Sequence, residues 1–154
     1  MLRLVPATDL VDARRRRHEH VSTPIERRCR VFVVDNNADL AQTLSEVIGF
    51  EPDFESVGFS SGGLDALSRA IEARADVLIL DFSLPGRNAL SVLDEARAAG
   101  TTMRILVYTG YGSPELAAES RARGAAGYIV KGGDFDEVAR EIRRVFPTGS
   151  DVGR

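Results

Sequence analysis

Residues 31–40, VFVVDNNADL, contain a run of four apolar residues that ends directly at an acid, Asp35. Such a run is typical of a parallel strand that helices cover on both faces. Asn37 then stands where a helix N-cap is expected, before an apolar pattern with helical spacing that reaches Ile48. A carboxylate at the end of a buried strand is costly unless a partner neutralises it. This stretch therefore predicts a strand, a turn and a helix, and it requires a partner for Asp35.

The same alternation of strand and helix continues along the chain. Apolar runs predict strands at Val31–Val34, Phe54–Phe59, Val77–Leu80, Ile105–Tyr108 and Tyr128–Val130. The second of the intervening helices is expected to bury Leu64, Leu67 and Ile71. The helix between Ser113 and Gly124 carries few large apolar residues. The sequence thus predicts an α/β fold of the (βα)5 type, a doubly wound parallel sheet of five strands with helices on both faces.

The positive charge of the chain is concentrated near the N-terminus. Residues 1–30 hold eight arginines and four acids, whereas residues 31–154 hold 12 basic and 19 acidic residues, so the two parts carry +4 and -7 of the total -3. We therefore expect residues 1–28 to be a basic extension that is mobile or loosely docked. Residues 29–147 are expected to form the domain, and residues 148–154 to be a C-terminal tail or a truncated linker.

The composition indicates a cytoplasmic protein. No apolar run approaches the roughly 20 residues that a membrane-spanning helix needs, and the N-terminus lacks the features of a secretory signal. Cys29 is the single cysteine of the chain and cannot form an internal disulfide. We expect neither a membrane partner nor an oxidising compartment.

Polar residues terminate four of the predicted strands: Asp35, Asp81, Thr109 and Lys131. Parallel strands all point the same way, so these residues should meet at the carboxyl edge of the sheet, where ligands bind in such folds. Two neighbouring carboxylates suit a Mg²⁺ ion between them, and an ammonium group can bind a phosphoryl oxygen. Lys131 is the only lysine in the chain. Together the four residues predict a site that transfers a phosphoryl group onto a carboxylate.

Four motifs, in this order, resemble the receiver domain of bacterial two-component response regulators over roughly residues 30–146. They are VVDNNADL, LILDFSLPG with Asp81, VYTGYG with Thr109, and GAAGYIVKGG with Lys131. The resemblance implies the flavodoxin-like strand order 2-1-3-4-5. That order would bring Asp35 beside Asp81 and would place Thr109 on the other side of Asp81.

The resemblance also implies a role for each site residue. Asp81 would accept a phosphoryl group from a sensor histidine kinase, and Lys131 would contact that group. Mg²⁺ would be held by Asp35, Asp81 and the backbone carbonyl of Ser83. Further roles fall on Thr109 as the switch hydroxyl, on Tyr128 as the aromatic switch, and on Ser83 and Tyr111 as positions that tune the lifetime of the phosphate.

One position of the sequence departs from the usual pattern of receiver domains. The family usually has two acids after the first strand, and here the second position is Asn36. An amide oxygen can bind Mg²⁺ but brings no charge, so we predict that Asn36 is a weakened ligand position.

The function implied by the resemblance is a signalling switch, not an enzyme, since it catalyses only its own phosphorylation and dephosphorylation. Phosphorylation would change the surface formed by the helix between Ser113 and Gly124, the strand Tyr128–Val130 and the helix that begins at Asp134. Partners would be the kinase or a phosphotransfer protein, a downstream protein or a fused output domain, and a second copy in a homodimer. Nucleic acid would be bound by an output domain or, as the weaker alternative, by the basic extension.

Two alternatives stay open at this point. Asn36 favours a pseudo-receiver, a scaffold that works without phosphorylation. An aspartyl-phosphate phosphohydrolase of the haloacid dehalogenase type needs a second aspartate two residues after the nucleophile, where this chain has Ser83. A nucleotide-binding protein is excluded, because no glycine-rich phosphate-binding motif follows the first strand.

Overall fold

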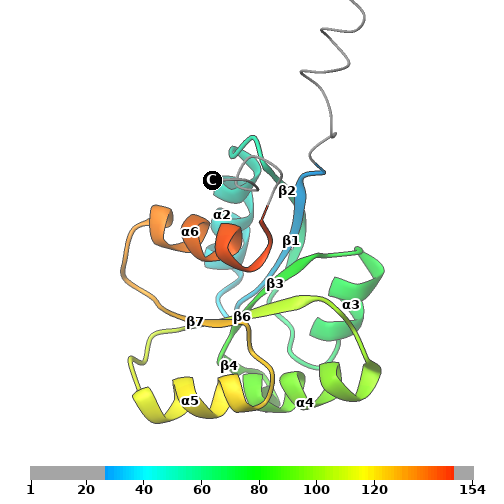
Figure 1. The fold of residues 1–154 in the computed structure, drawn as a ribbon, viewed down its shortest axis with the longest axis vertical. Helices are drawn as coiled ribbons and strands as arrows, with labels where there is room; N and C mark the ends of the chain where they lie inside the picture. Colours follow the sequence, from blue (N-terminus) through cyan, green and yellow to red (C-terminus); the bar gives the residue numbers. More distant parts are fainter. Residues whose placement is uncertain (1–26, 148–154) are drawn as a thin grey trace, which may run out of the picture.

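The structure is a computed structural model that describes residues 27–147. Its centre is a five-stranded parallel sheet in the order β2-β1-β3-β6-β7 (Figure 1). The strands are β1 (Cys29–Val34), β2 (Phe54–Ser60), β3 (Val77–Asp81), β6 (Arg104–Thr109) and β7 (Gly127–Val130). The helices are α2 (Ala38–Gly49), α3 (Ala66–Glu72), α4 (Ala89–Ala99), α5 (Pro114–Ala122) and α6 (Phe135–Val145). Because β6 and β7 are the fourth and fifth strands of this sheet, the order 2-1-3-4-5 and the predicted α/β fold are confirmed.

Helices cover both faces of the sheet. Figure 1 shows α2 and α6 on one face and α3, α4 and α5 on the other. Side chains of β1 alternate between two buried clusters, with Val31 and Val33 against α2 and α6, and Phe32 and Val34 on the side of α3 and α4. This alternation follows from the two-residue period of a strand, and it explains why the strand sequences are apolar throughout.

The helix starts follow the capping pattern of the sequence. Asn37, Asn88, Ser113 and Asp134 each accept a hydrogen bond from a backbone N–H in the first turn of the helix that follows. Asn37, Ser113 and Asp134 each lie three or four residues after the last residue of a sheet strand, whereas Asn88 is itself the last residue of the short strand β5 (Arg87–Asn88). None of the helices between residues 27 and 147 has the length and apolar character needed to cross a bilayer.

The predicted buried face of the second helix is confirmed for Leu67 and wrong for Leu64 and Ile71. Leu64 lies before α3 and is 77% exposed, and Ile71 is 43% exposed. The helix instead buries Leu67 together with the alanines at its first and fifth positions. The buried face of α3 therefore consists of one large side chain and two small ones one turn apart.

A short hairpin that the sequence analysis missed follows β3. Strands β4 (Ser83–Leu84) and β5 (Arg87–Asn88) pair antiparallel, and the turn between them contains Gly86 with a positive φ of 77°. Proline followed by glycine is a turn signal, and glycine adopts this backbone conformation without steric cost. The hairpin holds in place the residues that directly follow Asp81.

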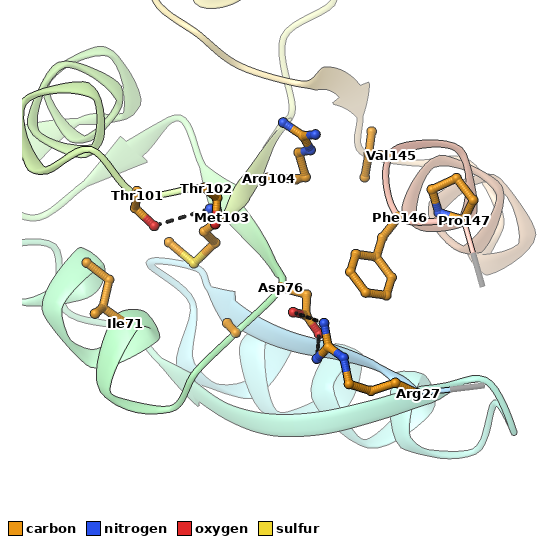
Figure 2. A pocket seen from close by; sticks show the side chains of 11 residues that line it. Arg27, Ile71, Asp76, Thr101, Thr102, Met103, Arg104, Val145, Phe146 and Pro147 are labelled. Atoms are coloured by element: carbon orange, nitrogen blue, oxygen red, sulfur yellow. Dashed lines mark hydrogen bonds and ion pairs between the residues drawn. The ribbon is translucent and has the colours of Figure 1, made fainter. Parts of the chain in front are cut away.

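The amino edge of the sheet holds a cavity of about 410 Å³, far from the polar strand ends (Figure 2). At its rim the Arg27 guanidinium donates two hydrogen bonds of 2.9 Å to the Asp76 carboxylate and lies 5.3 Å from the ring centre of Phe146. These contacts tie the start of the described chain to the end of α6. Residues 1–26 and 148–154 lie outside the described residues, so the extension and the tail stay predictions.

Candidate functional site

The structure brings the four polar strand ends together at the carboxyl edge of the sheet. Asp35 follows β1, Asp81 ends β3, Thr109 ends β6 and Lys131 follows β7. The first three are only 1%, 4% and 2% exposed, and Lys131 is half-buried. Parallel strands in this order therefore collect two acids, a hydroxyl and an ammonium group in one largely buried volume.

The Lys131 ammonium lies between the two acids. Its Nζ is 2.6 Å from Oδ2 of Asp35 and 3.3 Å from Oδ2 of Asp81. Burial acts to lower the pKa of Lys131, but the hydrogen bond to Asp35 and the attraction of Asp81 outweigh it and raise that pKa above 10.5. Lys131 is therefore a cation at neutral pH, and a single positive charge serves two carboxylates.

Backbone N–H groups supply the other hydrogen bonds of the two acids. The amide of Asn37 donates to Oδ1 of Asp35 at 2.9 Å, and the amide of Asn36 donates to Oδ2 of Asp81 at 3.2 Å. The amide of Ser83 donates to Oδ1 of Asp81 at 3.4 Å. The turn after β1 thus holds both acids, and it orients them without adding a positive charge.

The two proposed switch residues hold the same segment. The hydroxyl of Thr109 accepts a hydrogen bond of 3.2 Å from the amide of Tyr111, and the hydroxyl of Tyr128 donates one of 2.6 Å to the carbonyl of Tyr111. The half-buried ring of Tyr128 also packs against the core on the α3 and α4 side. Tyr111, whose side chain points to solvent with 70% of the residue exposed, therefore links the end of β6 to β7 through its backbone.

The model of the response regulator receiver domain matches residues 31–143, which include all or part of every strand of the sheet and the four site residues. The chain belongs to this family. Its match begins within β1 and ends within α6, so the receiver domain accounts for the fold from the first strand to the last helix.

Curated proteins similar to this receiver domain include transcriptional regulators and a phosphotransferase. The DNA-binding transcriptional activator DevR/DosR of Mycobacterium tuberculosis is 31% identical over 116 residues, which are 75% of this chain and 54% of that protein. The sporulation initiation phosphotransferase F of Bacillus subtilis is 25% identical over 122 residues, which are 79% of this chain and 97% of that protein. The chain thus spans about half of the activator and nearly all of the phosphotransferase.

Solved structures agree with the fold. The response regulator domain of Thermotoga maritima CheB is 27% identical, with a TM-score of 0.70 and coverage of 77% of this chain and 96% of that one. The complex of CheX and CheY with BeF3 and Mg²⁺ from Borrelia burgdorferi matches with 21% identity and a TM-score of 0.70, covering 77% of this chain and 89% of that one.

Two acids of this receiver domain offer donor atoms that fit a Mg²⁺ ion. The carboxylates of Asp35 and Asp81 are hard oxygen ligands of the kind that Mg²⁺ prefers. Within residues 27–147, however, no three residues among His, Cys, Asp and Glu are grouped so that they could hold a metal ion. Directly after Asp35, Asn36 offers an amide oxygen where the resemblance leads us to expect a further acid.

Two residues near the site were missed by the sequence analysis. Ser60 ends β2; its carbonyl accepts a hydrogen bond of 3.0 Å from the amide of Asp35, and its hydroxyl accepts one of 2.9 Å from Arg69. Tyr108 lies next to Thr109, and its ring centre is 5.3 Å from Nζ of Lys131. The signal for Ser60 was its place directly after the predicted strand Phe54–Phe59. Tyr108 gave no signal, because an aromatic residue in a strand is ordinarily part of the core.

Proposed function

We propose that this receiver domain accepts a phosphoryl group on Asp81 from a phosphohistidine of a sensor histidine kinase or phosphotransfer protein. The observation that carries the proposal is the position of the Lys131 ammonium, 2.6 Å from Asp35 and 3.3 Å from Asp81. This ammonium can follow negative charge from the free carboxylate to the phosphoryl oxygens. The family membership of the chain supports the same assignment.

The chemical step follows from the groups around Asp81. A carboxylate oxygen of Asp81 attacks the phosphorus atom, and the phosphorus–nitrogen bond of the donor breaks as the new oxygen–phosphorus bond forms. The imidazole nitrogen leaves with the electron pair of that bond. The amides of Asn36 and Ser83 hold the attacking carboxylate in place, and Lys131 neutralises the charge of the incoming group.

The carboxylates of Asp35 and Asp81 and the carbonyl of Ser83 would hold Mg²⁺ in this receiver domain. When bound, the ion supplies positive charge to the phosphoryl group. Asn36 occupies the weakened ligand position, and its amide leaves the site one negative charge short of the usual pattern in the family. This predicts phosphorylation that requires a higher concentration of Mg²⁺.

The response to phosphorylation would run through Thr109, Tyr128 and Tyr111. The new group adds about -1.5 to -2 of charge by analogy with other phosphorylated side chains. Thr109 donates to it, gives up its bond to the amide of Tyr111, and frees the segment that Tyr128 also holds. Helix α5 can follow at low cost, since Ser120 is the only buried residue within it. The surface of α5, β7 and α6 then changes its partner.

Ser83 and Tyr111 would tune the lifetime of the phosphate, since each lies two residues after a site residue and both are exposed. Partners would be the kinase, a downstream protein or output domain, or a second copy that docks on the α5, β7 and α6 surface. The M. tuberculosis relative is a DNA-binding activator, so contact with nucleic acid would come through an output domain outside the residues described here. The domain would catalyse only its own phosphorylation and dephosphorylation and would act on no substrate besides the phosphodonor.

Intact mass after incubation with Mg²⁺ and phosphoramidate tests this proposal. The wild type should gain one phosphoryl group, and Asp81→Asn should gain none. Asp76→Asn is a matched control, because Asp76 directly precedes the strand that Asp81 ends, and this variant should still be phosphorylated. Failure of the wild type to gain the group would favour a scaffold that works without phosphorylation, and rapid turnover of the donor without an adduct would favour a phosphohydrolase.

A further inference from the structure

Tyr108 is the penultimate residue of β6 and lies in the middle of the site. It is paired in register with Asp81 of β3 on one side and with Ile129 of β7 on the other. The residue is half-buried and packs against the core formed with α2 and α6. Its ring is the only one within the described residues that lies under the ammonium of Lys131, with 5.3 Å between Nζ and the ring centre.

The path of the Lys131 side chain explains why a ring lies there. Lys131 follows β7, whereas Asp35 follows β1, and the strands β6 and β3 lie between them. The backbone amide of Lys131 is fixed by a hydrogen bond of 2.7 Å to the carbonyl of Thr109. To reach Asp35 the side chain must therefore cross β6, and Tyr108 is the residue over which the ammonium lies as it does so.

We propose that Tyr108 is a positioning residue for Lys131. The face of an aromatic ring attracts a cation through its quadrupole and carries no formal charge. It therefore holds the ammonium at the carboxyl edge without forming a salt bridge that would compete with the acids. The N–H donors of Lys131 stay free for Asp35 and Asp81 before transfer and for phosphoryl oxygens afterwards. The role of Tyr108 after transfer, when Lys131 binds phosphoryl oxygens, rests on the proposed phosphorylation of Asp81.

Selective labelling tests the contact itself, because Lys131 is the only lysine of the chain. Protein grown with ¹³C-lysine gives a single set of lysine signals. Protons of the Lys131 ε-CH2 group should be shifted upfield by the ring current of Tyr108. The shift should persist in Tyr108→Phe, which keeps the ring, and disappear in Tyr108→Leu. An unshifted signal in the wild type would overturn the proposal without any variant, so the test does not depend on whether Tyr108→Leu folds.

Phosphorylation kinetics test the consequence. With phosphoramidate at saturating Mg²⁺, Tyr108→Phe should react at the rate of the wild type, and Tyr108→Leu should react about 3- to 10-fold more slowly, the range of one cation–π contact. Equal rates for the Leu and Phe variants would overturn the positioning role. If the wild type accepts no phosphoryl group, the proposed function fails, but the lysine spectrum still decides whether Tyr108 holds Lys131.

Discussion

Two regions of the molecule each place one basic side chain between two acids, and they differ in their contact with water. At the amino edge, Arg143 binds Asp53 with bonds of 2.8 and 2.9 Å and Glu51 with one of 3.1 Å. At the carboxyl edge, Lys131 lies between Asp35 and Asp81. The acid side chains beside Arg143 are 22% and 29% exposed, whereas those beside Lys131 are 1% and 6% exposed.

This difference separates a structural ion pair from a binding site with the same charge count. Water screens the second acid beside Arg143, and the planar guanidinium satisfies Asp53 with two parallel bonds. Beside Lys131 the second acid is buried, where unscreened like charges repel strongly. We therefore expect the carboxyl edge to lower the stability of the fold unless a further cation binds there. We propose that burial of the unbalanced charge, more than the charge itself, distinguishes the proposed site from the ion pair at the amino edge.

The largest effect should come from breaking the pair at the amino edge. Asp53→Asn removes the charge and turns an acceptor oxygen into an amide group that faces Arg143, so we expect a loss of about 2 kcal/mol in the free energy of unfolding. Urea denaturation measures it. Asp65→Asn is the control, since Asp65 is exposed and its side chain makes no capping bond. If the free energy of unfolding falls no further in Asp53→Asn than in the control, the pair of Arg143 and Asp53 contributes no stability.

The second effect concerns the Mg²⁺ ion that we propose for the carboxyl edge. Asn36→Asp restores an acid beside Asp35 and should tighten Mg²⁺ binding about tenfold, equivalent to about 1.4 kcal/mol, as measured by calorimetric titration. Asn37→Asp adds the same charge one residue further on, where the side chain caps α2. That control should change the affinity by no more than about twofold, because an exposed charge is screened. Equal tightening in both variants would show a general charge effect and would remove Asn36 from the ligand set.

The site could be predicted from the sequence because its geometry follows from strand direction. Asp35, Asp81, Thr109 and Lys131 each follow an apolar run, and parallel strands deliver such residues to one edge whatever the details of the loops. The strand ends themselves were predicted to within two residues. What these features could not predict is that one ammonium contacts both acids, since this depends on how far a lysine reaches across two strands.

The buried face of α3 was predicted only in part. Of the three large apolar residues on which the prediction rested, Leu67 is buried, Leu64 lies before the helix, and Ile71 is 43% exposed, while two alanines complete the buried face. Tyr108 was predicted only as the end of a strand, and its contact with Lys131 could not be predicted because the two residues lie 23 positions apart at the ends of neighbouring strands. Periodicity reports which residues are apolar, whereas the distance between layers decides which of them are buried.

The third prediction compares the removal of the second acid from each region. Asp81→Asn relieves the repulsion between buried carboxylates and keeps an oxygen for the amide of Asn36, so without Mg²⁺ it should raise the free energy of unfolding by about 1 kcal/mol. Glu51→Gln removes the corresponding acid beside Arg143 and should change stability by less than about 0.5 kcal/mol, since that acid is exposed to solvent. Denaturation in the presence of a chelator measures both. A loss of stability in Asp81→Asn would contradict the unbalanced charge at the carboxyl edge.

The smallest effect is the response of the amino edge to acid. The hydrogen bonds from Arg143 lower the pKa of Asp53, and burial opposes them. A lowered pKa means that the unfolded chain binds protons first, so this pair stabilises the fold above a pH of about 4 and loses that contribution as the pH falls through the lower folded value. We expect the loss to be below about 1 kcal/mol, because water reaches both partners. Urea denaturation between pH 5 and 3 should therefore show a shallower decline for Asp53→Asn than for the wild type. Parallel declines would mean that Asp53 does not titrate with the fold, and the contrast between a water-screened and a buried charge would then rest on the carboxyl edge alone.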